Sequence, residues 1–248
     1  MPREISLAEI FQIGYYWETK ILLTAVKLRV FSELTSGPES AQSLAARLHW
    51  DVRCLPLLLN ALVAMRVLEK VDEQYSNSQV TTRYLVQSSS EYVGHLLELH
   101  DSEWENWGKL EETIRTGVSP VTQHVFETSP EMGANVLSVL HRIGQGSGPS
   151  LAKKMNLDGA KEFLDLGGGA GTNAIAFCQE YPTLHATVFD LPTTLEVTKR
   201  TVQGAGCGSR ISFIGGNFHE DTLGGPYDAV LMSDILHYQD DKTNAALV

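Results

Sequence analysis

The sequence predicts an α/β chain in which a mainly helical winged-helix domain precedes a Rossmann-like domain. The second domain is predicted by a strand at 161–166, a glycine-rich loop, a helix at 172–181 and a second strand at 185–189. A strand, a helix and a strand within about 30 residues form a parallel, right-handed crossover unit. The first domain is predicted by helical patterns that lead into a short hairpin. We expect the winged helix at 1–100, connecting helices at 101–157 and the Rossmann-like domain at 158–248.

In the first domain, helix signals come before strand signals. Ser6 to Glu9 has the pattern of a capping box and opens an apolar helix that runs towards Leu34. Asp51 is expected to cap a further helix, in which apolar residues recur at helical spacing from Leu55 to Val63. Residues 67–76 then predict a hairpin with a charged turn. Helices followed by a two-stranded wing form a winged-helix module.

Winged helices often bind DNA, but the charges in this one disfavour a DNA-binding regulator. Residues 1–100 contain 9 Lys and Arg against 11 Asp and Glu. The helix that would enter the groove offers only Arg53 and Arg66 among leucines. Phosphate contacts dominate affinity for DNA. We therefore favour a buried, dimer-forming role for this domain, with plain core packing as the alternative for the leucine-rich helix.

The composition of the whole chain also argues against a nucleic-acid-binding protein. The 248 residues are 43% hydrophobic and 20% charged, and 19 Lys and Arg against 30 Asp and Glu give a net charge of −11. Such a balance argues against a protein that coats nucleic acid or an anionic membrane. Cys54, Cys178 and Cys207 are far apart, so we expect neither a disulfide framework nor a zinc cluster, as is typical of a reducing cytosol.

Membrane insertion and export are not expected. The most apolar run, residues 55–68, is interrupted by Pro56, Asn60 and Arg66 and falls short of the ~20 residues that a span needs. Glu4 comes early at the N-terminus, and no uninterrupted apolar stretch of a signal peptide follows it. We therefore expect a cytoplasmic protein.

Two further segments lie between the hairpin and the Rossmann-like domain. From Tyr92 to Leu110 a helical pattern carries Trp104 and Trp107, which we interpret as packing residues. Residues 144–149, with the sequence Gly-Gln-Gly-Ser-Gly-Pro, predict a flexible stretch before a short helix. Such a stretch is either a linker or a segment that closes over a ligand, since glycine lets backbone approach closely.

The glycine-rich loop distinguishes between two classes of ligand. Gly167, Gly169 and Gly171 occupy alternate positions after Asp165, whereas the dinucleotide fingerprint is G-x-G-x-x-G. An acid inside the strand suits an ammonium group and repels a pyrophosphate. Asp190, at the end of the second strand, can accept hydrogen bonds from both hydroxyls of a ribose. We therefore favour S-adenosylmethionine over NAD as the cofactor.

These motifs resemble those of class I S-adenosylmethionine-dependent O-methyltransferases of the plant caffeate and animal hydroxyindole type. The resemblance covers nearly the whole chain. Its four motifs, in order, are residues 164–171, 189–192, 215–218 and 228–241. Residues 107–110 and the winged helix resemble the family's dimerisation domain. The resemblance implies a homodimer that methylates a hydroxyl of a small aromatic or polyketide-like acceptor.

The resemblance also implies which residues bind the cofactor. Gly167 would place backbone next to the methionine part, and Asp190 would hold the ribose. Asn217 and Phe218 would lie at the adenine, one as a hydrogen-bonding group and one as a packing group. The family usually has Asp at position 217, but an amide still offers an acceptor oxygen; the alternative for Asn217 is a turn residue. Ser233 occupies a position where many relatives carry Lys or Arg.

His237 is the candidate general base. It follows the apolar strand at 230–232, at the carboxyl edge of a parallel sheet, where ligands of open α/β sheets bind. A hydrogen-bonded structural role is the alternative. The family's usual His-Asp-Trp reads His-Tyr-Gln at 237–239, so the neighbouring acid is missing. We interpret the other seven histidines as incidental and expect no bound metal.

The relatives continue beyond the fourth motif, whereas this sequence ends at Val248. We therefore expect a C-terminally truncated chain with an incomplete Rossmann-like domain, which aggregates, oligomerises or needs a partner. The alternative to an active O-methyltransferase is a non-catalytic S-adenosylmethionine-binding or dimerisation protein left by truncation.

Overall fold

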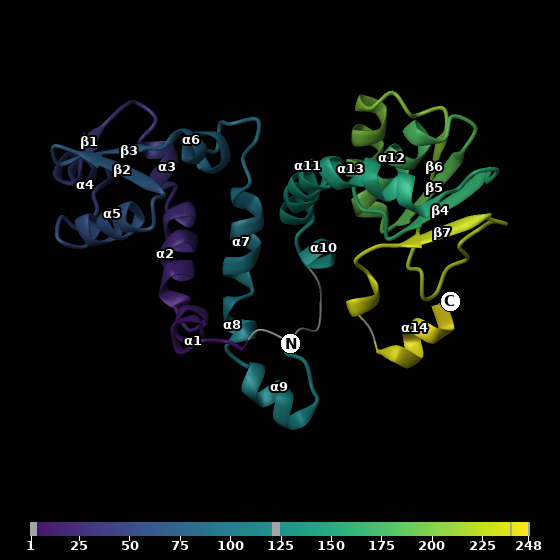
Figure 1. Cartoon of the computed structure of the whole chain (residues 1–248), viewed down its shortest axis with the longest axis horizontal. Helices are drawn as coiled ribbons and strands as arrows, with labels where there is room; N and C mark the ends of the chain where they lie inside the picture. The colour runs from purple at the N-terminus through teal and green to yellow at the C-terminus, as the bar shows by residue number, and fades with distance from the viewer. Residues whose placement is uncertain (1–3, 121–124, 239, 248) are drawn as a thin grey trace. The chain divides into compact units, whose positions relative to one another are not determined.

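The structure is a computed structural model that describes residues 4–120, 125–238 and 240–247 (Figure 1). It consists of two compact units, residues 1–120 and 121–248. The first unit is mainly helical with a small antiparallel sheet, and the second is built on a parallel sheet. The predicted order, a helical region followed by a Rossmann-like sheet, is therefore confirmed.

The N-terminal part of the first unit forms three helices: α1 (Leu7–Ile13), α2 (Tyr16–Lys27) and α3 (Val30–Glu33). The capping box is confirmed, because Ser6 Oγ accepts from the backbone N–H of Glu9 and the backbone N–H of Ser6 donates to Glu9 Oε2 at 2.9 Å. The prediction of one helix towards Leu34 is wrong. Arg29 has a φ of 58°, and a residue in this left-handed conformation ends a helix.

The predicted hairpin is confirmed. Its strands are β2 (Leu68–Val71) and β3 (Gln74–Asn77), which pair antiparallel with Val71 opposite Gln74. The turn residues Asp72 and Glu73 both have positive φ, as in the tight turns that match the twist of a hairpin. A third strand, β1 (Glu39–Ser40), pairs with β3. Its two residues are too few to give an alternating pattern, so the sequence did not predict it.

The leucine-rich helix is α5 (Cys54–Ala64), and it packs in the core of this unit. Asp51 caps its start, since Asp51 Oδ1 accepts from the backbone N–H groups of Arg53 and Cys54, both at 2.9 Å. Leu59 and Leu62 are fully buried. One face of this helix therefore packs in the hydrophobic core, as the alternative interpretation of the leucine-rich helix expected.

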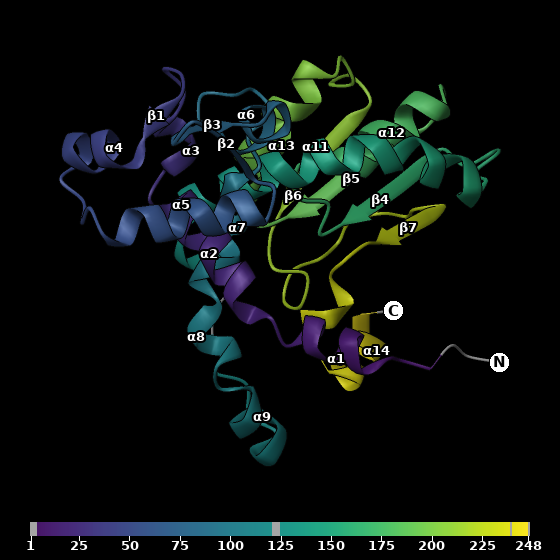
Figure 2. The same cartoon turned by 60° about the vertical axis from the view of Figure 1, so that its left-hand side comes forward.

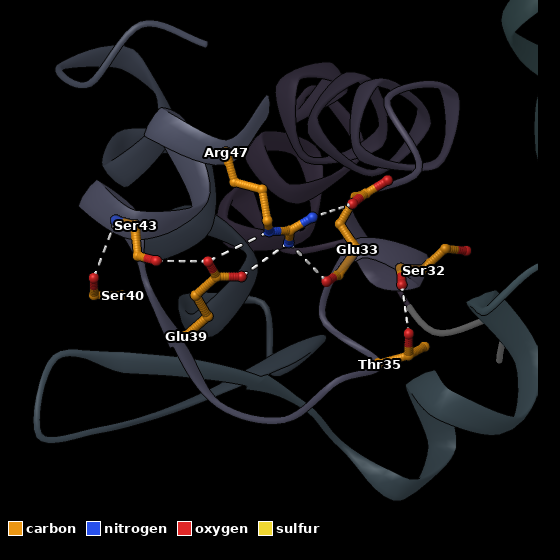
Figure 3. A network of polar contacts seen from close by, with 7 residues as sticks. All are labelled: Ser32, Glu33, Thr35, Glu39, Ser40, Ser43 and Arg47. Atoms are coloured by element: carbon orange, nitrogen blue, oxygen red, sulfur yellow. Dashed lines mark hydrogen bonds and ion pairs between the residues drawn. The ribbon is translucent and has the colours of Figure 1, made fainter. Parts of the chain in front are cut away.

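Helix α4 (Ala41–Leu48) is joined to α3 and β1 by Arg47 (Figure 3). Its guanidinium donates from Nη1 to Glu33 Oε2 at 2.7 Å and from Nη2 to Glu39 Oε2 at 2.9 Å. Ser43 Oγ also donates to Glu39 Oε1, at 2.7 Å. The hydrogen bond from Arg47 holds the pKa of Glu39 below its ordinary value. This network links α4 to α3 and β1.

Four helices complete the first unit: α6 (Gln79–Leu85), α7 (Gly94–Ser102), α8 (Trp104–Trp107) and α9 (Leu110–Thr116). The helical pattern from Tyr92 to Leu110 is thus divided among separate helices. Both views show α7 beside α2 (Figures 1 and 2). Asp101 joins the two helices, since it accepts from Lys20 Nζ at 2.6 Å and from Lys27 Nζ at 3.0 Å.

The second unit contains a parallel sheet with the order β6-β5-β4-β7. Its strands are β4 (Glu162–Leu166), β5 (His185–Asp190), β6 (Ile211–Gly215) and β7 (Ala229–Met232). Helices α12 (Thr172–Glu180) and α13 (Pro192–Gly204) connect β4 to β5 and β5 to β6, so the predicted crossover unit is confirmed. Both crossovers run in the same direction, which places both helices on one face of the sheet (Figure 2).

The segment predicted as a flexible stretch lies inside one helix, α11 (Pro130–Met155), so that prediction is wrong. Two of its glycines, Gly144 and Gly148, face α12. A Cβ on Gly144 would lie 3.0 Å from Thr172 Cγ2, and one on Gly148 would lie 3.0 Å from the Cβ of Ala176. Glycines four residues apart therefore let the two helices pack closely.

The remaining helical elements are α10 (Val125–Thr128), the 3-10 helix η1 (Leu236–Tyr238) and α14 (Asp241–Leu247). Both faces of the sheet are apolar. Phe163 and Phe177 stack on one face at 4.7 Å between ring centroids, and Leu166 and Phe189 are buried on the other. Within the described ranges, no helix combines the length and apolar character that crossing a membrane requires.

Candidate functional site

A cavity of about 560 Å³ lies at the carboxyl ends of the parallel strands. Its walls come from the loop after β4, from the residues that follow β5, β6 and β7, and from helix α11. After β4 the chain adds β5 and β6 on one side of β4, and it then adds β7 on the other side of β4. The order of the strands therefore reverses at β4. Ligands of open α/β sheets bind in the crevice at such a point.

The glycine-rich loop forms the floor of this cavity. Gly167, Gly169 and Gly171 have φ values of 66°, 54° and 78°, a conformation that L side chains rarely adopt. A Cβ on Gly167 would lie 2.5 Å from Ile235 Cγ2. The loop therefore needs glycine both for its backbone conformation and for its contact with the residues after β7, and it presents backbone to the ligand.

Asp190, at the end of β5, is held by two backbone groups. Its Oδ2 accepts from the N–H of Gly169 at 2.8 Å, and its Oδ1 accepts from the N–H of Leu191 at 2.7 Å. Burial raises the pKa of Asp190 above its ordinary value, although these hydrogen bonds act in the other direction. Each carboxylate oxygen retains acceptor capacity, so the side chain is placed to bind hydroxyl groups in the cavity.

Asp165, near the end of β4, is a second carboxyl group of the cavity wall. It is 1% exposed, its Oδ2 accepts from the N–H of Ala174 at 3.0 Å, and its Oδ1 has no hydrogen-bond partner among the described residues. Burial, with a smaller contribution from the charge of Asp190, raises the pKa of Asp165 to about 7, although the hydrogen bond from Ala174 acts in the other direction. None of the described residues that line the cavity is a lysine or an arginine.

Five of the residues implied by the resemblance lie in the wall of this cavity: Gly167, Asp190, Asn217, Phe218 and Ser233. Asn217 Oδ1 accepts from the N–H of His219 at 3.1 Å, so this residue also shapes the turn after β6. The ring of Phe218 lies 4.5 Å from that of His219. The structure therefore brings these residues together from four separate segments of the chain.

His237 is not among the described residues that line the cavity. It lies in η1, two residues after Ile235, which does line it. Its side chain is 56% exposed, and its Nδ1 lies 3.5 Å from Asp234 Oδ1. The acid that the sequence lacks directly after His237 thus has a counterpart three residues before it.

Sequence reasoning missed the contribution of α11 to the cavity. His141 lines the cavity, and its Nδ1 lies 2.7 Å from Thr172 Oγ1. Burial lowers the pKa of His141 below its ordinary value, with a smaller effect of Arg142. Leu137, Leu140 and Ile143 line it as well. Their helical spacing was the available signal, but the following glycines were interpreted as a linker.

The fold and the cavity together define a Rossmann-like domain for a nucleoside ligand. The acid at the end of β5 suits a ribose, and the unpartnered carboxyl oxygen of Asp165 suits a positive charge and would repel a phosphate. Comparison with known proteins identifies the family. A model of the O-methyltransferase domain matches residues 109–248, and a model of the O-methyltransferase dimerisation domain matches residues 11–87.

Individual relatives agree with these matches. The 3-hydroxy-5-methyl-1-naphthoate 3-O-methyltransferase of Streptomyces sahachiroi is 31% identical over 240 residues, which cover 94% of this chain and 69% of the relative. The tetracenomycin polyketide synthesis 8-O-methyl transferase TcmO of Streptomyces glaucescens is 30% identical, over 94% of this chain and 70% of the relative. The solved structure of an O-methyltransferase family protein from Burkholderia thailandensis matches with a TM-score of 0.84 and 26% identity, over 99% of this chain and 75% of that one.

The chain therefore belongs to the O-methyltransferase family, and it is an S-adenosylmethionine-dependent methyltransferase. The cavity fits this cofactor. Its volume lies in the range of small-molecule sites. Asp165 offers a buried oxygen without a partner to a cationic group, and Asp190 offers fixed acceptors to a ribose.

Proposed function

We propose that this enzyme transfers a methyl group to a hydroxyl of a small aromatic or polyketide-like acceptor, with His237 as the general base. The observation that carries the proposal is the cavity at the strand ends, which has a buried carboxyl group, Asp165, a half-buried one, Asp190, and no lysine or arginine among its described lining. Such a cavity selects a positively charged adenosine compound and disfavours a dinucleotide.

In this proposal the cavity residues bind the cofactor as the sequence predicts. Asp190 accepts from the ribose hydroxyls, and the backbone at Gly167 contacts the methionine part. Asn217 and Phe218 bind the adenine, and Ser233 lies at the rim after β7. The support is their common position in one cavity wall, together with the positive φ of Gly167.

The acceptor class rests on the relatives and on the α11 side of the cavity. The two relatives described above act, by their names, on a naphthoate and on a tetracenomycin polyketide. Phe126, Leu137, Leu140 and Ile143 give this chain an apolar wall. Aromatic rings bury large apolar areas, so such a wall favours a flat aromatic acceptor.

His237 would take the proton of the acceptor hydroxyl. Transfer of a proton from a phenol with a pKa near 10 to an imidazole with a pKa near 6.5 costs about 5 kcal/mol. Asp234, 3.5 Å from Nδ1, stabilises the imidazolium that forms and orients the ring. When bound, S-adenosylmethionine supplies a methyl group on a positively charged sulfur. The chain's own residues hold the acceptor beside it, which is chiefly a matter of positioning.

We also propose that the enzyme is a homodimer. The dimerisation model matches residues 11–87, which include α2 to α5. Large apolar side chains are exposed at the N-terminal edge of this region: Phe11, Ile13, Tyr16 and Trp17 are 57%, 78%, 65% and 48% exposed. Exposed apolar groups of this size mark protein interfaces. The partner would be a second copy of the chain.

The test is a single-turnover assay with methyl-labelled S-adenosylmethionine and a panel of naphthols and hydroxylated polyketides. His237→Ala should lower the transfer rate by about 10²- to 10⁴-fold, the usual contribution of a general base. His185→Ala is the control, since His185 is exposed at the start of β5. Equal rates for both variants would refute the assignment of the base. Cofactor binding without any transfer would support the non-catalytic alternative.

A further inference from the structure

Helix α11 presents an almost entirely apolar wall to the cavity. Its lining residues within the described part of the chain are Leu137, Leu140, His141, Ile143, Gly144 and Ser147. The hydroxyl of Ser147 donates to the carbonyl oxygen of Gly144 at 3.3 Å, so its hydrogen is used within the helix. The half-buried imidazole of His141 is the titratable group of this wall. Small-molecule sites use a few such polar groups among apolar ones to fix the orientation of a ligand.

The imidazole of His141 is held in place from α12. Its Nδ1 lies 2.7 Å from Oγ1 of Thr172, which is the first residue of α12 after the glycine-rich loop. Gly144, almost one turn further along α11, allows this approach, because a Cβ at Gly144 would lie 3.0 Å from Thr172 Cγ2. The methyl group of Thr172 therefore lies against Gly144 while its hydroxyl group bonds His141, and the two contacts together restrict the rotation of the ring.

The other ring nitrogen of His141, Nε2, is available to a ligand. It has no hydrogen-bond partner among the described residues, and it is not one of the polar atoms that the fold seals from solvent without a partner. Burial lowers the pKa of His141 below its ordinary value, so the ring is neutral at pH 7.5. A neutral imidazole has one nitrogen that donates and one that accepts. The direction of the hydrogen bond with Thr172 decides which of the two Nε2 is.

We infer that His141 is a specificity-determining residue: its Nε2 bonds a second hydroxyl group of the aromatic acceptor, in addition to the hydroxyl that is methylated. The inference rests on the proposed function, in which the apolar side chains of the same wall hold the ring of the acceptor. A hydroxyl group fits both tautomers of His141, because it can donate as well as accept. A carbonyl oxygen only accepts and therefore fits one of them. The expected acceptors are thus dihydroxylated aromatic compounds.

Calorimetric titration of the 248-residue chain saturated with S-adenosylhomocysteine tests the inference, because it measures acceptor binding without turnover. The probes are 1-naphthol and a series of dihydroxynaphthalenes that keep one hydroxyl at the same position and vary the position of the second. We expect at least one isomer to bind about 3- to 10-fold more tightly than 1-naphthol, as one hydrogen bond between neutral groups provides. If no isomer binds more than about two-fold more tightly, the inference is overturned.

Variants of His141 locate the preference. His141→Phe keeps an aromatic ring but has no nitrogen, so the preference for the second hydroxyl should disappear. His141→Gln carries an amide nitrogen as many bonds from the backbone as Nε2 and should keep part of the preference. The ratio of the two affinities is measured within each variant, so a general loss of binding cancels. His185→Phe is the control, since His185 is exposed at the start of β5, outside the described lining. A preference as large in His141→Phe as in the unmodified chain would overturn the inference.

A second substitution decides the question if His141→Phe fails to fold. Thr172→Val keeps the shape of the side chain and removes the hydroxyl that holds Nδ1. The ring is then free to turn, so the preference should fall here as well. An unchanged preference in Thr172→Val would contradict the positioning of His141 by Thr172.

The outcomes also separate this inference from the proposed function. A preference for the second hydroxyl without methyl transfer to any acceptor supports the inference and refutes the proposed activity. Methyl transfer without such a preference does the reverse. If His141→Phe weakens binding of S-adenosylhomocysteine more than about 10-fold and leaves the preference unchanged, His141 serves the cofactor and the inference is wrong. Binding of none of the naphthols would overturn both proposals.

Discussion

The backbone N–H of Gly169 donates to Asp190 Oδ2 at 2.8 Å, so the glycine-rich loop after β4 and the acid at the end of β5 form one rigid corner. Thr198 on α13 fixes the same loop from the other side, since its Oγ1 donates to the carbonyl oxygen of Gly169 at 2.6 Å. The carboxylate that would hold a ribose is therefore positioned by the loop that would contact the rest of the cofactor. Such preorganisation favours tight binding, because little freedom is lost when the ligand arrives.

Asp190→Ala should weaken binding of S-adenosylhomocysteine by about 10- to 100-fold, since hydrogen bonds to a charged group contribute about 1.5–3 kcal/mol each. It also leaves the N–H groups of Gly169 and Leu191 without their acceptor. Calorimetric titration measures the loss. Glu196→Ala is the control, because Glu196 is an exposed acid on α13 whose partner is Lys199. Unchanged affinity in Asp190→Ala would exclude the assigned role.

Gly167→Ala should destabilise the second unit more than the same change at a glycine with similar backbone. Gly167 has a φ of 66° and its Cβ would lie 2.5 Å from Ile235 Cγ2, whereas Gly206 has a φ of 71° and faces no described atom within 4 Å outside its immediate neighbours. Gly206→Ala should cost about 1 kcal/mol for the left-handed backbone alone. Gly167→Ala should cost about 1–3 kcal/mol more for the clash. Equal losses in denaturant unfolding would contradict the contact with Ile235.

Substitutions along α11 test the close packing against α12. Gly146→Ala should stabilise the chain by about 0.5–1 kcal/mol, because Gly146 is exposed and alanine is the better helix former. Gly148→Ala should give less than this gain, since its Cβ would lie 3.0 Å from the Cβ of Ala176, and Gly148→Val should destabilise by about 1–3 kcal/mol. Thermal unfolding measures the series.

In the same series, Gly148→Ala should stabilise more in an Ala176→Gly background than in the unmodified chain, because the opposing Cβ is then absent. The comparison is made within each background, since Ala176→Gly itself destabilises α12. Full stabilisation by Gly148→Ala alone, equal to that of Gly146→Ala, would show that the two helices do not pack as closely as described.

Local patterns in the sequence predicted the parts of the site that depend on local backbone. The alternate glycines after Asp165 and the acid at position 190 follow directly from the strand, loop and strand pattern, and both lie in the cavity wall. The α11 wall was missed because Gly144 and Gly148 have the composition of a linker, and only their contacts with α12 show that they are packing residues.

Elsewhere the sequence carried too little local signal. Arg29 is a good helix former by its intrinsic propensity, so its residue type does not predict the left-handed backbone that separates α2 from α3. The two residues of β1 are too few to show a period. The contact between His237 and Asp234 depends on the backbone after β7, where Asp234 has a φ of 60°.

Arg47→Met should lower the stability of the first unit at pH 7, because it removes the contacts with Glu33 and Glu39. The folded pKa of Glu39 is lowered, so its contribution is present above the ordinary carboxyl pKa and is lost as pH falls through the folded value. The difference from the unmodified chain in thermal unfolding should therefore shrink below about pH 4.

Arg53→Met is the control for this change, since Arg53 is 87% exposed in its side chain and pairs only at the surface with Asp51. It should have a smaller effect at both pH values. A deficit in Arg47→Met that is as large at pH 3 as at pH 7 would mean that the packing of its stem, and not its charge, joins α4 to α3 and β1.

The central claim is that the cavity at the ends of β4 and β5 binds an adenosine compound that carries an ammonium group and no phosphate. Parallel calorimetric titrations with S-adenosylhomocysteine and with NADH at pH 7.5 test it most directly. We expect S-adenosylhomocysteine to bind with a stoichiometry of one per chain and to lose affinity in Asp190→Ala, and we expect NADH to give no heat of binding. Saturable binding of NADH that Asp190→Ala weakens, with no binding of S-adenosylhomocysteine, would contradict the account.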